Sequence, residues 1–360
     1  MRLFACQNCS HMLYFENTHC EQCKKQLGYI SASATLSVVD PAGEEFQALA
    51  EPQGRYRFCD NARLGACNWL IGEDCTGIFC AACRHNRVVP DLSIEANRLG
   101  WRKIEFAKHR LFYTLLRLGL PLANRVDAPE TGLAFDFLTE TPAETQPVMT
   151  GHEHGVITLN LAEADEGLRE QLRAQMGEPY RTLLGHFRHE VGHHFWDELV
   201  DRGGRLEAFR ACFGDERPDY NEALKSYYSA GPAANWQDSF VSAYASSHPW
   251  EDFAETWAHF LHIVDSLEMA GAFGLRIRPN VEVTEKPEAD LDERSAEAGD
   301  INSLIDAWLP VTFAVNSLNR CMGQPDLYPF VLSAAAIAKL GFIHDLVRGE
   351  LPEPRGSTPR

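Results

Sequence analysis

The sequence predicts an α+β chain in which a small β-rich N-terminal domain precedes a mainly helical domain with a small sheet. Nine of the eleven cysteines lie before residue 84, among short runs of β-forming residues. From about Ser93 the pattern changes, and apolar residues recur at helical spacing. The boundary is therefore expected near Pro90, with one domain over residues 1–90 and a second over residues 91–350.

The N-terminal cysteines form two sets, of which the first contains two C-x2-C knuckles and the second ends in one. Four thiolates arranged as two C-x2-C pairs suit one tetrahedral structural zinc, and in a reducing compartment metal ligation is favoured over disulfides. Cys75 is left over and remains an alternative member of the second set. The expected ligands are Cys6, Cys9, Cys20 and Cys23 for one zinc, and Cys59, Cys67, Cys80 and Cys83 for another.

The second domain is expected to begin with a long helix and to continue with a small sheet. Residues 96–120 carry apolar side chains at helical spacing for about six turns. Two β-like stretches follow, at 132–138 and 154–164. The second alternates apolar and polar residues, which indicates a strand with one solvated face; it can lie at the edge of the sheet or inside it.

After a short helix expected over residues 168–177, four more helical segments are expected along the remaining chain. Residues 180–200 are amphipathic and end at Gly203, and residues 249–271 begin with Pro249. Two further apolar segments, 302–322 and 326–348, predict the last helices. This order of elements accounts for the mainly helical character of the second domain.

The sequence HEVGH, residues 189 to 193, lies inside the helix expected over residues 180–200. Two histidines at i and i+4 share one helical face, so His189 and His193 can bind the same metal ion. Glu190 then lies beside the open coordination position, where it can take a proton from the attacking water and pass it to the leaving amine. Gly192 leaves room for close packing of the helix. The motif predicts a catalytic zinc.

A catalytic zinc needs a third protein ligand, and the helix over 249–271 offers two candidates. Glu251 and Glu255 are four residues apart and share a face, so either can ligate while the other orients a histidine. Asp197 is a further candidate for orienting a histidine. The remaining histidines of these helices are expected to be structural or to face substrate, namely His186, His248, His259 and His262.

The combination of H-E-x-x-H with E-D-F-A-E at residues 251–255 resembles the gluzincin metallopeptidases. That resemblance implies that Glu251 is the zinc ligand, that Glu255 accepts a hydrogen bond from a ligand histidine, and that Tyr244, seven residues before the ligand, supports the oxyanion. It also implies a zincin-like fold in which substrate pairs with an edge strand, for which 154–164 is the candidate.

The chain as a whole resembles a bacterial family of zinc-binding metallopeptidases with an N-terminal zinc ribbon. The segments that carry the resemblance are CNWL (67–70), CRHNRVVPDL (83–92), RHEVGHHFWD (188–197) and SAYASSHPWEDFAETWAH (242–259). It implies a hydrolase that holds one catalytic and two structural zinc ions and cleaves a protein or peptide. The alternative is an inactive zincin fold that binds protein partners through its ribbons.

The composition bounds the cellular setting. The 360 residues include 33 Lys and Arg against 51 Asp and Glu, a net charge of −18, and a surface of this sign repels nucleic-acid phosphates. No run of eighteen apolar residues occurs, and the start MRLFACQNC lacks the features of a signal peptide. We therefore expect a cytoplasmic protein without a nucleic-acid or membrane partner; the oligomeric state is not indicated.

Overall fold

The computed structural model divides into two compact units. It describes residues 1–140, 148, 150–176, 182–280, 287–292, 295–297 and 299–351. The first unit comprises Met1–Gly177 and Thr182–Phe187, and the second comprises Glu178–Arg181 and Arg188–Arg360. The division passes through one helix, so that HEVGH belongs to the second unit.

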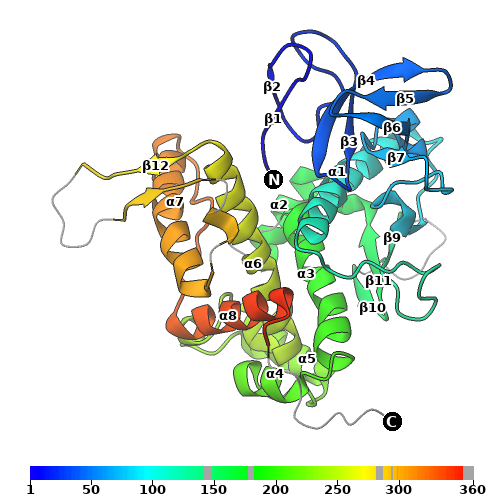
Figure 1. Ribbon diagram of the computed structural model, residues 1–360. Coiled ribbons are helices and arrows are strands. Elements are labelled where there is room, and N and C mark those ends of the chain that lie inside the picture. Colours follow the sequence, from blue (N-terminus) through cyan, green and yellow to red (C-terminus); the bar gives the residue numbers. More distant parts are fainter. Residues whose placement is uncertain are drawn as a thin grey trace. The chain divides into compact units, whose positions relative to one another are not determined.

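The first unit opens with the predicted β-rich region. A short antiparallel pair comes first, and a five-stranded antiparallel sheet in the order β3-β4-β5-β6-β7 follows (Figure 1). Ile30, Val39, Ala48 and Leu70 form a small apolar cluster on it. The strands are β1 (Phe4–Ala5), β2 (Met12–Leu13), β3 (Leu27–Ile30), β4 (Thr35–Ala42), β5 (Glu45–Ala48), β6 (Glu51–Phe58) and β7 (Leu70–Gly72).

A second, four-stranded sheet has the order β10-β11-β9-β8. The predicted strand at 154–164 is shorter than expected, because Leu161–Ala164 turn into a 3₁₀ helix, and its alternating burial is confirmed. It is paired on both sides, so of the two positions left open the interior one is correct, and the edge position implied by the gluzincin resemblance is wrong. The strands are β8 (Asn86–Val88), β9 (Ala134–Leu138), β10 (Gly151–Glu153) and β11 (Val156–Asn160).

Helix α1 (Glu95–Arg117) is the long helix that the apolar spacing predicts. It buries a face of large side chains, and Phe112 packs edge-to-face on Phe135 of β9 with ring centroids 5.9 Å apart. The helix also carries three buried ionisable side chains, which are described below. Helix α2 (Glu166–Met176) also lies in this unit, and residues 177–181 lie outside the described part of the chain.

The second unit is helical, as predicted. Helix α6 (Pro249–Ala272) lies at its centre; His248 caps its N-terminus and accepts the Trp250 N–H at 3.1 Å, and Pro249 occupies the first turn. Helices α7 and α8 pack beside it (Figure 1), and Lys339 of α8 pairs with the buried Asp252 of α6 at 2.6 Å. The helices are α3 (Leu183–Phe195, shared with the first unit), α4 (Leu206–Phe213), α5 (Tyr220–Ala230), α6, α7 (Ile301–Cys321) and α8 (Ala334–Arg348).

Two boundaries in this unit differ from the predictions. The last helix begins at Ala334 rather than at residue 326, because Ser333 caps it by accepting the Ala336 N–H at 3.2 Å. Helix α3 ends at Phe195 and continues as a π-helical turn over Trp196–Asp201. Strands β12 (Arg276–Ile277) and β13 (Ala289–Asp290) form a small hairpin, and residues 281–286 lie outside the described part of the chain.

Candidate metal centre

The second half of α3 and the first half of α6 approach each other closely at Gly192. A Cβ atom on this residue would lie 3.0 Å from the Ala254 Cα and 3.2 Å from the Trp257 Cβ. The predicted reason for a glycine here, close packing of the helix, is therefore confirmed. The absence of a side chain lets the two helices bring their polar faces together.

The three predicted ligands converge at this approach. Their candidate ligand atoms are the two Nε2 atoms of His189 and His193, 3.2 Å apart, and Oε2 of Glu251, which lies 3.0 Å from the first and 3.5 Å from the second. Tetrahedral ligands about 2.1 Å from a zinc ion are about 3.4 Å from one another. The donor set and its spacing therefore fit zinc.

Two of the three predicted ligands, His189 and Glu251, are oriented by a hydrogen bond on the far side. His189 Nδ1 lies 2.8 Å from Oε1 of Glu255, whose other oxygen accepts the Ser242 hydroxyl at 2.6 Å. The Tyr220 hydroxyl donates to Glu251 Oε1 at 2.5 Å, which leaves Oε2 facing the two histidines. Contacts of this kind fix the tautomer and direction of metal ligands.

Tyr220 was not among the residues that sequence reasoning selected. It lies 31 positions before Glu251, at the N-terminus of α5, and no motif links the two. The only signal near Tyr220 in the sequence is Asp219, a recognisable helix cap whose side chain accepts the Glu222 N–H at 2.9 Å. That signal predicts the helix start and says nothing of the contact with Glu251.

Aromatic side chains surround the histidines. The Trp250 ring lies over His193 with centroids 3.8 Å apart, and Tyr244 lies 6.0 Å from His189 by the same measure. Tyr244 begins a 3₁₀ turn over Tyr244–Ser247, and its ring also contacts Tyr227. The predicted oxyanion residue therefore lies beside the histidine ligands.

Burial and neighbouring charges shift the titration of these groups. Burial is the largest cause that raises the pKa of Tyr220 and Tyr244 well above the ordinary value, and the charge of Glu251 is the second. Both tyrosines therefore remain hydroxyl donors near neutral pH. Burial lowers the pKa of His189, but the carboxylates of Glu251 and Glu255 outweigh it and hold that pKa well above the usual range. The two carboxylates therefore favour positive charge at this position.

Glu190 is buried, with 6% of its surface exposed, and its charge contributes to the raised pKa of Tyr220. Its carboxylate is thus within electrostatic range of Tyr220. Asp197 falls in the π-helical turn after α3, where the helical spacing that suggested an i+4 relation to His193 changes. Its predicted role in orienting a histidine stays a prediction.

The other histidines make structural contacts, as expected. His248 caps α6, His259 Nδ1 lies 2.7 Å from the Tyr328 hydroxyl, and His262 contacts Arg188, which also pairs with Asp265. In the first unit, His186 Nδ1 lies 3.0 Å from Oε2 of Glu163.

The cysteines lie in two clusters in the first unit. In the first cluster, the two Sγ atoms are 3.6 Å apart in the pair Cys6 and Cys23 and also in the pair Cys9 and Cys20. In the second cluster, the Sγ atoms of Cys67 and Cys80 are 3.7 Å apart. Tetrahedral thiolates on zinc are separated by about 3.8 Å, whereas bonded sulfurs are separated by about 2.05 Å. Cys75 is exposed and outside both groups. The clustered residues are Cys6, Cys9, Cys20 and Cys23, and Cys59, Cys67, Cys80 and Cys83.

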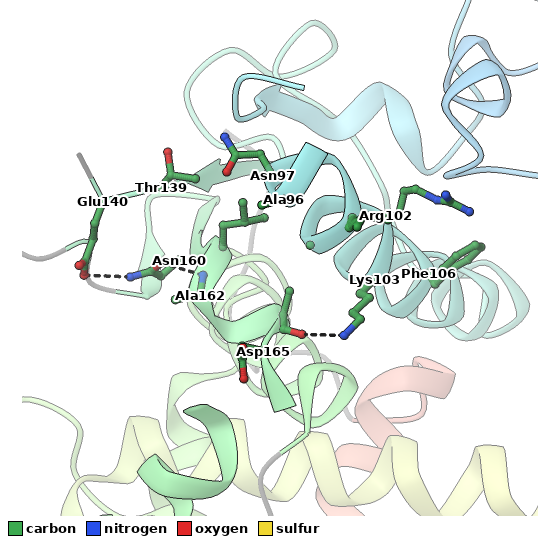
Figure 2. Close-up of a pocket in the computed structure, with 14 residues that line it drawn as sticks. Ala96, Asn97, Arg102, Lys103, Phe106, Thr139, Glu140, Asn160, Ala162 and Asp165 are labelled. Carbon is green, nitrogen blue, oxygen red and sulfur yellow. Dashed lines mark hydrogen bonds between the residues drawn. The ribbon is translucent and has the colours of Figure 1, made fainter. Parts of the chain in front are cut away.

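A cleft of about 790 Å³ lies elsewhere in the first unit, between α1 and the turn after β11 (Figure 2). Asn160 Nδ2 donates to Glu140 at 3.2 Å, and Lys103 Nζ donates to the Ala164 carbonyl at 3.4 Å. The described residues that line it include none of the predicted ligands or catalytic groups. The cleft is therefore separate from the candidate metal centre.

A family model described as "Putative zinc-binding metallo-peptidase" matches residues 97–346, more than half of the sequence. The chain belongs to this family. A zinc-ribbon domain model matches residues 3–94 ahead of it. The family and the two four-cysteine clusters identify a zinc-binding protein with an N-terminal zinc ribbon, and the predicted α+β fold class is confirmed.

Relatives in the same family extend over nearly the whole chain. Uncharacterised proteins of Mycobacterium tuberculosis and Mycobacterium bovis are each 41% identical over 355 residues, which cover 98% of this chain and 97% of the relative. No solved structure matches the chain. Among the described helices, none is long and apolar enough to cross a membrane.

Proposed function

We propose that this family member is a zinc-dependent endopeptidase whose catalytic zinc is held by His189, His193 and Glu251. The observation that carries the proposal is the convergence of these three donor atoms at zinc-ligand spacing, with Glu190 adjacent in the same helix. A cytoplasmic protein or peptide is the proposed substrate. The two cysteine clusters are proposed to hold structural zinc, which gives three zinc ions per chain.

A zinc ion in this site supplies Lewis acidity, which polarises a peptide carbonyl and lowers the pKa of water to about 7. Glu190 accepts a proton from the attacking water and delivers it to the leaving amine. Its burial beside the ligands suits this role, because a desolvated carboxylate close to the reacting atoms exchanges protons efficiently.

The two tyrosines are proposed to act differently. Tyr244 lies beside His189 and donates its hydroxyl to the carbonyl oxygen as negative charge develops there. Tyr220 is already engaged with Glu251 Oε1 and acts through that ligand. Glu255 serves His189 in the same way, and its hydrogen bond keeps Nε2 directed at the metal position.

Removal of zinc tests the proposed function. The purified chain is incubated with an unbiased peptide library, and new N-termini are counted by mass spectrometry before and after treatment with a chelator. Chelation is expected to abolish cleavage because Lewis acidity is lost, and added zinc is expected to restore it. Cleavage that survives complete removal of the third zinc, as measured by elemental analysis, contradicts the proposal.

Paired tyrosine variants separate the two hydroxyl roles. Tyr244→Phe is expected to lower kcat about 10²- to 10³-fold with little change in KM, as for loss of one oxyanion donor. Tyr220→Phe is expected to weaken zinc binding about 10- to 100-fold and to recover activity in excess zinc. Rescue of Tyr244→Phe by zinc, with no effect of zinc on Tyr220→Phe, would reverse the assignment.

A further inference from the structure

Helix α1 places three polar side chains against the second cysteine cluster. Glu105 and Lys108 are fully buried and His109 is 3% exposed, although each belongs to a residue type that is seldom buried without a partner. Glu105, His109 and Cys83 have polar atoms within 4.8 Å of one another. These helix residues lie beyond the segment that the zinc-ribbon model covers, residues 3–94.

His109 is oriented by its own helix and faces two of the cysteines. Its Nδ1 lies 2.6 Å from the backbone carbonyl of Glu105, one turn earlier. Its Nε2 therefore points outward, 3.5 Å from the Cys83 Sγ and 4.0 Å from the Cys80 Sγ. The Trp69 ring packs edge-on to the imidazole with centroids 5.2 Å apart and restricts its movement.

Glu105 contacts both the Cys83 sulfur and the buried ammonium of Lys108. Its Oε2 lies 3.6 Å from the Cys83 Sγ, and its Oε1 accepts Lys108 Nζ at 2.8 Å and Asn86 Nδ2 at 2.9 Å. Lys108 also contacts Asn86 Oδ1 and lies over the rings of Phe135 and Phe137. The Lys108 ammonium is thus held by polar groups and by two aromatic rings.

A second metal ion bound by Cys83, Glu105 and His109 is the competing interpretation of this group. Lys108 argues against it, because the buried ammonium already occupies the cation position at Glu105 and would repel a divalent ion in a medium of low dielectric constant. Glu105, Lys108 and His109 instead lie outside the cysteine ligands. Polar groups in such positions hold the ligands in place around a metal ion.

We propose that Glu105, Lys108 and His109 of α1 form the outer shell of the second zinc centre and determine how tightly it retains its metal. Four thiolates on one zinc ion carry a net negative charge that is costly to bury without polar neighbours. The helix supplies such neighbours on the side of Cys80 and Cys83. The zinc ribbon and the first helix of the metallopeptidase region are therefore one metal-binding structure. This inference does not depend on the proposed peptidase activity.

The test measures zinc loss from each cysteine cluster in the full chain. His109→Phe retains the ring volume and removes the ring nitrogens. Protein is exposed to a chelator, released cysteines are alkylated at intervals, and the modified residues are identified by peptide mapping. Cys80 and Cys83 are expected to become reactive about 10- to 100-fold faster than in the wild type, whereas Cys6 and Cys9 keep their wild-type rate and serve as the internal control.

Phe112→Leu is the matched control, since Phe112 is buried on the same helix and contacts His85 and Phe135. It is expected to leave zinc release near the wild-type rate. In cobalt-substituted protein, the thiolate charge-transfer band is expected to shift in His109→Phe and to stay in place in Phe112→Leu. Equal acceleration in both variants, or no acceleration in His109→Phe, overturns the proposal.

Glu105→Gln provides the decisive variant where His109→Phe does not fold. It preserves size and hydrogen-bonding capacity at Oε1 and removes only the negative charge next to Lys108. Slower alkylation confined to Cys59, Cys67, Cys80 and Cys83 supports the outer-shell role, because a neutral amide then replaces the anionic oxygen 3.6 Å from the Cys83 thiolate. Alkylation at the wild-type rate in this folded variant overturns it.

Discussion

Replacement of Glu190 by Gln is expected to reduce peptide hydrolysis by about 10²- to 10⁴-fold while zinc content stays unchanged, because the amide cannot accept a proton from water. The substitution preserves shape and leaves the donor atoms of His189, His193 and Glu251 in place. Turnover is measured on the best substrate from the peptide library, and zinc is measured in the same preparation by elemental analysis.

Glu198→Gln is a suitable control, since this glutamate lies one turn or more beyond the histidines in the π-helical segment and pairs with Arg202. It is expected to retain activity within about twofold, as surface ion pairs contribute little. A Glu190→Gln variant with full zinc and full activity would remove the general-base role and favour a different route to hydrolysis.

Replacement of Glu251 by Ala is expected to lower the zinc content from three ions per chain to two and to abolish hydrolysis. Two histidines alone leave a catalytic zinc without the third protein ligand that such sites use. The loss is also expected to be specific, because both cysteine clusters lie in the other unit and retain their donors. Elemental analysis and library cleavage are the two measurements.

Glu255→Gln distinguishes a ligand from a residue that orients one. Glu255 contacts His189 Nδ1 and lies on the far side of that ring, so its loss is expected to weaken zinc binding about 10- to 100-fold without removing the site. Excess zinc should then restore much of the activity. Retention of the third zinc in Glu251→Ala and its loss in Glu255→Gln would exchange the roles of the two glutamates.

Local patterns carried much of the information about this fold. The period of the apolar residues predicted α1, α3 and α6, and the cap at His248 and Pro249 follows from ordinary helix chemistry. The spacing of i and i+4 also predicts, without any tertiary contact, that His189 and His193 share one helical face. These features depend only on neighbours in the sequence.

Features that depend on distant contacts could not be predicted in the same way. The edge or interior position of β11 is decided by pairing with β10 and β9, which its own alternation does not encode. The contact of Tyr220 with Glu251 depends on where α5 packs, and that of His109 with Cys83 depends on α1 lying against a ribbon cluster. Neither Tyr220 nor His109 belongs to a recognisable motif.

Helix α5 gives the metal centre an unusual dynamic property. None of its side chains is fully buried, yet Tyr220 at its first position holds Glu251, which is 1% exposed. A helix with so little buried surface opens at a small fraction of the free energy needed to unfold a protein, and its backbone amides exchange with solvent accordingly. Local opening of α5 is therefore expected to break the hydrogen bond on the Glu251 carboxylate, so hydrogen exchange of this helix should report on the integrity of the proposed metal centre while the core of the unit remains folded.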